Sequence, residues 1–72
     1  MNAYAAIFEE TSTGWSAYCP DLPGLGVAGP TREDTEQLLR EGIVFHIDGM
    51  IADGDPISEP TTKVALVQVQ AA

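Results

Sequence analysis

The sequence contains one cysteine, Cys19, and one histidine, His46. An internal disulfide is therefore impossible, and neither a metal site of cysteine and histidine ligands within one chain nor a cofactor is expected. With 72 residues, the chain can form one domain with a small core. Such domains are commonly stabilised by disulfides, metals or oligomerisation, so oligomerisation is the remaining route.

Basic residues are scarce: Arg32, Arg40 and Lys63 stand against 11 acidic residues, and the formal net charge is -8. The three basic residues form no stripe, so direct binding to the phosphates of DNA or RNA is not expected. An acidic domain attracts basic proteins. The same charge also keeps a small protein soluble, and the charge alone leaves both interpretations open.

Long hydrophobic runs are also missing. No stretch approaches the length of a membrane span, and the first residues lack the basic and apolar regions of a signal peptide. We therefore expect a cytoplasmic protein in which Cys19 stays reduced. The apolar share of 44% suits a globular fold and argues against disorder.

The N-terminal half predicts three short strands. Residues 3–10 are apolar on both faces, as in an interior strand that is covered on both sides. A polar turn ending at Gly14 joins them to residues 15–19, which should pair with them antiparallel. After a loop rich in proline and glycine, residues 25–28 predict a third strand at a sheet edge.

A helix is predicted from Thr31, which can cap the amide of Asp34, to about Asp53, where Gly54 can end it. Its predicted apolar stripe contains Leu38, Leu39, Ile43, His46, Met50 and Ile51. Gly42 and Gly49 lie seven residues apart. They either allow a neighbour to approach closely, which we favour, or merely cost helix stability.

Residues 63–69 (KVALVQV) predict a last strand. The fold class is therefore α+β, in the order β-β-β-α-β, with residues 1–72 as a single domain. A right-handed crossover through the helix gives a four-stranded mixed sheet of order 3-2-1-4, with the helix packed on one face. One helix cannot cover both faces of that sheet. The exposed apolar surface predicts a homodimer or higher oligomer, a partner protein, or both.

A nucleotide-binding loop and a catalytic histidine both find little support in the sequence. Residues 24–29 fit G-x-G-x-x-G, but Pro23 and Pro30 flank them and no long parallel sheet fits this chain, so a nucleotide site is not expected. His46 has no nucleophile at helical spacing, and a packed or interfacial histidine is the better interpretation.

The loop Asp21-Leu22-Pro23-Gly24 is the most distinctive local feature. A stiff, partly apolar loop loses little entropy on binding, and nearby aromatic side chains could anchor a partner. A structural turn with Trp15 in the core is an equally good interpretation. The candidate partner-binding residues are Glu9, Glu10, Trp15, Tyr18, Asp21, Leu22 and Pro23.

Four motifs together resemble the HicB antitoxin family. They are residues 18–24 (YCPDLPG), Gly29 with Thr31, residues 45–50 (FHIDGM) and residues 53–57 (DGDPI). The resemblance implies a partial RNase H-like fold without nuclease carboxylates. It also implies binding to a small, basic, RNA-cleaving HicA-like toxin whose active site the antitoxin covers.

Two features depart from the family pattern. Leu25 stands where members commonly carry cysteine, and the sequence stops at Ala72, without the C-terminal DNA-binding module that is frequent in full-length antitoxins. We expect no separate DNA-binding domain, and the sequence does not tell whether promoter autoregulation exists without one.

The first hypothesis is the antitoxin of a type II toxin–antitoxin pair, which is not an enzyme. The alternative is a solitary HicB-like oligomer with a structural or adaptor role. A metal-dependent nuclease is disfavoured because residues 5–8 (AAIF) supply no carboxylate in the middle of the first strand.

Overall fold

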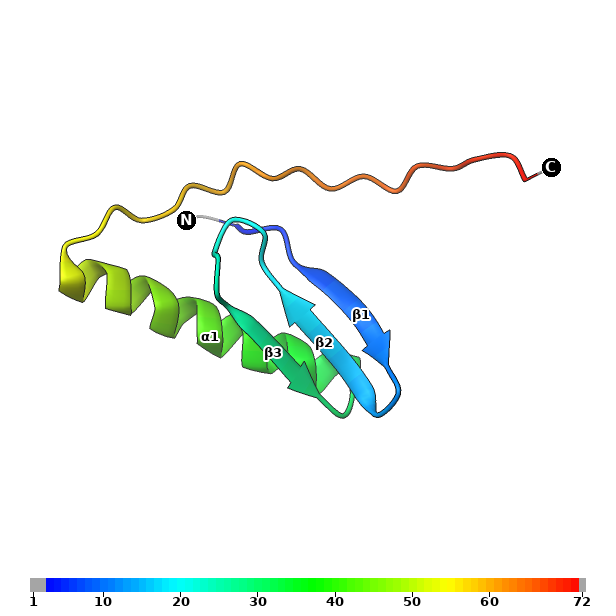
Figure 1. Cartoon of the computed structure of the whole chain (residues 1–72), viewed down its shortest axis with the longest axis horizontal. Coiled ribbons are helices and arrows are strands. Elements are labelled where there is room, and N and C mark those ends of the chain that lie inside the picture. The colour runs from blue at the N-terminus through cyan, green and yellow to red at the C-terminus, as the bar shows by residue number, and fades with distance from the viewer. Residues whose placement is uncertain (1–2, 72) are drawn as a thin grey trace.

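A meander of three antiparallel strands precedes one long helix in the computed structural model, which describes residues 3–71. The strands are β1 (Ile7–Thr11), β2 (Gly14–Tyr18) and β3 (Gly26–Gly29), and the helix is α1 (Arg32–Asp53) (Figure 1). The predicted strand pairing is confirmed, with Phe8 opposite Ala17 in the β1–β2 ladder. The strand ends differ from the predicted ones by a few residues.

The predicted four-stranded mixed sheet is wrong. The sheet has three strands in the order β1-β2-β3, and all of its pairs are antiparallel. Residues 63–69 carry the side chains of a strand, but they form no strand and run away from the sheet (Figure 1). The β-branched residues of this segment favour a strand because their side chains fit a pleated surface. A strand also needs a neighbouring strand to hydrogen-bond with, and side-chain type does not supply one. As a result β1, which was expected in the interior, lies at a sheet edge.

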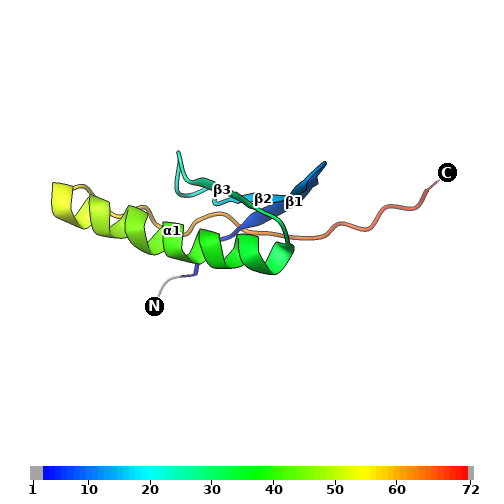
Figure 2. The same cartoon turned by 90° about the horizontal axis from the view of Figure 1, so that it is seen from below.

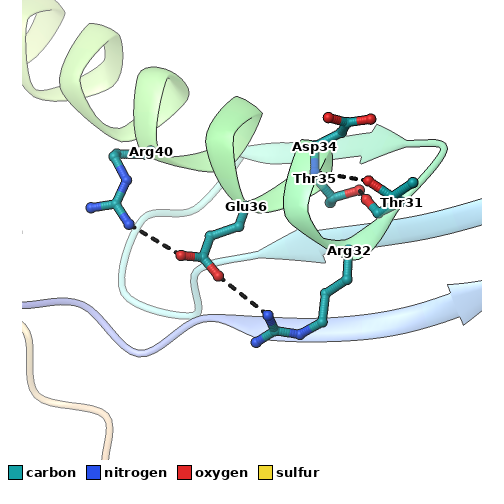
Figure 3. A network of polar contacts seen from close by, with 6 residues as sticks. All are labelled: Thr31, Arg32, Asp34, Thr35, Glu36 and Arg40. Carbon is teal, nitrogen blue, oxygen red and sulfur yellow. Dashed lines mark hydrogen bonds and ion pairs between the residues drawn. The ribbon is translucent and has the colours of Figure 1, made fainter.

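The predicted ends of the helix are confirmed. The Thr31 side chain accepts a hydrogen bond from the Asp34 amide at 3.0 Å (Figure 3). At the other end Gly54 adopts φ 74°, which glycine tolerates best, and its amide donates to the Ile51 carbonyl. The Asp55 amide donates to the Met50 carbonyl at 2.9 Å, which completes a Schellman motif. Both ends are therefore fixed by local sequence.

A small core lies between the sheet and one face of α1, and Figure 2 shows the helix on a single side of the sheet. Its buried apolar members are Ala17, Cys19, Leu22 and Leu39. From the predicted stripe, Leu39, Ile43 and Met50 pack in this core, whereas Leu38 and Ile51 are exposed.

Glycine allows close approach at one of the two expected helix positions. A Cβ on Gly42 would lie 2.9 Å from Leu25 Cδ1, so the expectation is confirmed there, whereas a Cβ on Gly49 would meet nothing within 4 Å.

His46 is half-buried, and its Nε2 has no hydrogen-bond partner among residues 3–71.

Candidate partner-binding surface

Of the seven predicted contact residues, the four that belong to strands lie on different faces of the sheet. Opposite residues of an antiparallel pair point to the same face, and successive residues alternate. Since Phe8 and Ala17 belong to the core, Glu10 and Trp15 point to the helix-covered side, whereas Glu9 and Tyr18 point to the open side. Glu9, Glu10 and Tyr18 are exposed and Trp15 is half-buried. The structure therefore does not gather these four residues into one patch.

Leu22 anchors the loop after β2 from inside the protein. Its side chain is 0% exposed, its amide donates to the Cys19 carbonyl at 3.0 Å, and its carbonyl accepts from the Leu25 amide at 3.2 Å. Gly24, at φ 86°, provides the left-handed turn that follows. Pro23 beside it is exposed. Leu22 therefore holds the loop in place, and Pro23 and Gly24 are exposed to a partner.

Asp21 joins this loop to a segment that is distant in the sequence. Its carboxylate accepts hydrogen bonds from the Thr62 amide at 2.9 Å, the Thr62 hydroxyl at 2.8 Å and the Thr61 hydroxyl at 3.1 Å. The bond from the Thr62 amide is the main reason that the pKa of Asp21 lies below its ordinary value, because it favours the charged form. We name Asp21, Thr61 and Thr62 the carboxylate clamp. No periodic pattern in the sequence indicates this clamp, because its members lie about forty residues apart.

Cys19 lies at the start of the same loop and is buried. Burial raises the pKa of its thiol, and the neighbouring charge of Asp21 raises it further. Since the thiolate is the reactive form, Cys19 acts as a small apolar core residue.

The outward side of α1 carries an exposed aromatic side chain that the site prediction did not include. Phe45 is 81% exposed, and Val44 beside it is also exposed. Together with Glu41, Asp48, Gln37 and Arg40, they line an open depression. We call Glu41, Val44, Phe45 and Asp48 the α1 outer face. Exposed apolar side chains beside two carboxylates are suited to a basic protein partner, and the one basic neighbour, Arg40, is paired with Glu36.

The basic side chains of α1 are paired along the helix. Arg32 and Arg40 contact the two carboxylate oxygens of Glu36 at 3.3 and 3.1 Å (Figure 3). The Arg32 guanidinium also lies over the Phe8 ring, 4.6 Å from its centroid. These exposed pairs add little stability. They leave the two helix arginines partly neutralised.

Within residues 3–71, no group of three or more histidine, cysteine or acidic side chains is placed to hold a metal ion. In the same part of the chain, no helix has the length and apolar character needed to cross a membrane.

An acidic surface, an exposed aromatic side chain and an uncovered sheet face are features of a domain that binds other proteins. Residues 4–71 match the family described as HicB_like antitoxin of bacterial toxin-antitoxin system. The chain belongs to this HicB-like antitoxin family.

Three relatives are similar in sequence, and the first of them carries the name of this family. Antitoxin HicB 2 of Photorhabdus laumondii is 35% identical over 69 residues, which are 94% of this chain and 50% of that protein. An uncharacterized 14.9 kDa protein of Haemophilus phage HP1 is 36% identical over 79% of this chain and 44% of its own length. A UPF0150 protein of Synechocystis is 34% identical over 75% of this chain and 70% of its own length.

The chain thus spans about half the length of the first two of these relatives. No significant match was found among solved structures.

Proposed function

We propose that this chain is the antitoxin of a type II toxin–antitoxin pair and that it neutralises a small, basic, HicA-like RNA-cleaving toxin by binding it. The family assignment over residues 4–71 carries this proposal. We infer a non-catalytic role in the cytoplasm, without direct nucleic-acid binding by this chain. We also propose that the chain forms a homodimer or higher oligomer.

The mechanism that we propose is competition for a basic surface. A ribonuclease must attract the phosphates of its RNA substrate with basic side chains. A domain of net charge -8 can occupy the same surface and exclude the substrate. Binding of this kind should weaken as salt is added, because exposed charges are screened.

The α1 outer face is the contact surface that the geometry supports best. Phe45 can serve as an aromatic anchor, and Glu41 and Asp48 beside it can meet basic side chains. The predicted residues Glu9, Glu10, Trp15, Tyr18, Asp21 and Pro23 remain candidate contacts, spread over both sides of the sheet and the loop after β2. Leu22 would support the loop contacts from within.

The first experiment is co-purification. The chain would be expressed with a small basic protein that is encoded beside its gene, with a tag on only one of the two, and RNA cleavage would be measured with and without this chain. A stable complex in which cleavage is suppressed is the expected result. Two separately eluting proteins and undiminished cleavage would refute the antitoxin proposal.

Matched variants would locate the contact. Glu41→Gln combined with Asp48→Asn removes two charges from the α1 outer face. Asp53→Asn combined with Asp55→Asn removes the same charge at the exposed end of the helix. We expect the first pair to weaken toxin binding by about tenfold and the control pair by much less. Equal losses would show that only net charge matters.

A further inference from the structure

Residues 63–70 form an apolar segment that the fold does not cover. Leu66 is 98% exposed, Val67 80% and Val69 84%. Both views show the end of this segment extending past the sheet and the helix (Figures 1 and 2). Apolar surface of this kind in a soluble domain normally marks an interface.

The segment has a fixed base. The carboxylate clamp holds residues 61 and 62 against the loop after β2. Slightly earlier, the Tyr4 hydroxyl donates to the Ser58 carbonyl at 2.7 Å. The chain is therefore tied down until residue 62, and residues 63–70 are presented outward from that point, away from the β1 strand of the same chain (Figure 1).

The same protein offers an acceptor for a strand. Among residues 3–71, no strand pairs with the outer edge of β1, so its backbone N–H and C=O groups are available for a further ladder. A mainly apolar groove lies between this end of the sheet and α1. Its apolar lining comes from Ala3, Tyr4, Ala6, Phe8, Leu39, Ile43 and Val44.

We propose that residues 63–70 of one copy add as a strand to the β1 edge of a second copy, whose own segment returns the contact. Alternation places Val64 and Leu66 on one face of the added strand and Val67 and Val69 on the other. A strand that is apolar on both faces is suited to the interior of an assembly. In a reciprocal exchange, the exposed segment and the free β1 edge of both copies are paired within one closed two-fold dimer.

The local charge of residues 63–70, in contrast to the net charge of the chain, favours a second copy over a basic partner as the occupant. The chain has no acidic residue after Glu59, and Lys63 is the one charged side chain of the segment. A basic toxin would find no carboxylate there to attract it. The acidic β1 strand, with Glu9 and Glu10 exposed, instead attracts Lys63. The exchange therefore specifies the self-association proposed above, and it does not require the toxin.

The test compares two single substitutions in the full chain by sedimentation over a range of concentrations. Leu66→Asp places a charge in the proposed interface, although the monomer leaves Leu66 almost fully exposed. Gln70→Asp adds the same charge near the end of the segment. We expect Leu66→Asp to raise the dimer dissociation constant by about tenfold or more, and Gln70→Asp to change it far less.

A second variant, Val44→Asp, disrupts the groove that is proposed to accept the segment of the other copy. Val44 lines the groove and is exposed, so Val44→Asp should leave the monomer folded, which circular dichroism would verify. In a mixture of the Leu66→Asp and Val44→Asp chains, one intact segment can meet one intact groove. We therefore expect mixed dimers to form more readily than dimers of either variant alone.

Three results would overturn the exchange. They are a wild-type chain that stays monomeric at high micromolar concentration, a dimer that Leu66→Asp leaves unchanged, and a mixture that shows no gain. A dimer insensitive to Leu66→Asp would overturn the exchange while leaving self-association intact. Toxin inhibition by the Leu66→Asp chain judges the antitoxin proposal separately, because Leu66 lies outside the α1 outer face.

Discussion

Replacement of Leu22 by alanine should destabilise this protein more than its loop position suggests. The side chain is 0% exposed, so the substitution removes buried apolar atoms and leaves a cavity, at a cost of about 2–5 kcal/mol. A chain of 72 residues has a free energy of unfolding of roughly 4–11 kcal/mol. Leu22→Ala should therefore remove a large fraction of the stability.

Urea unfolding followed by circular dichroism would measure the effect. The free energy of unfolding of so small a domain falls by about 1 kcal/mol for each molar of urea, so the urea concentration at the unfolding midpoint should fall by about 2 M or more. The matched control is Leu66→Ala, the same change at a side chain that is 98% exposed, studied at a concentration where the chain is monomeric. We expect the control to change stability by less than about 0.5 kcal/mol. Equal effects of the two substitutions would refute the reasoning that Leu22 anchors its loop from the core.

Three further predictions concern the clamp and the helix. The hydrogen bonds to Asp21 stabilise its charged form, so its contribution to the free energy of unfolding should be present at neutral pH and lost as the pH falls below about 4. Hydrogen exchange of the Thr62 amide should accelerate over the same pH range. An Asp21→Asn chain with the same pH response would contradict this prediction. Thr31→Ala should cost about 1 kcal/mol, measured by thermal unfolding, because the Asp34 amide loses its acceptor. Gly49→Ala should stabilise α1 by up to about 1 kcal/mol, and Gly42→Ala should gain less because its Cβ would crowd Leu25; an equal gain at both positions would count against the close approach.

The elements that were predicted correctly from the sequence are those that depend on residues close together in the chain. Thr31 and Gly54 set the limits of α1 because capping depends on residues within one turn of the helix. The β1–β2 hairpin followed from two apolar segments and a short turn. The motifs spread over the chain also identified the family before any contact was known.

The candidate site depended more on contacts between distant residues. Leu22 was a candidate partner contact because its loop is stiff and partly apolar, yet its side chain is buried in the core. Asp21 was predicted to face a partner, and it binds Thr61 and Thr62, about forty residues away. Phe45 fell within the helix, and only the packing of α1 on the sheet showed that this side chain points outward.

The sequence by itself determined a small acidic domain, a capped helix, a short meander and membership of the HicB-like antitoxin family. The tertiary structure decided which apolar residues are buried and that residues 63–69 leave the sheet. The physical reason is that caps and hairpins are satisfied by near neighbours. A strand, in contrast, needs a hydrogen-bonding partner that its own sequence does not supply.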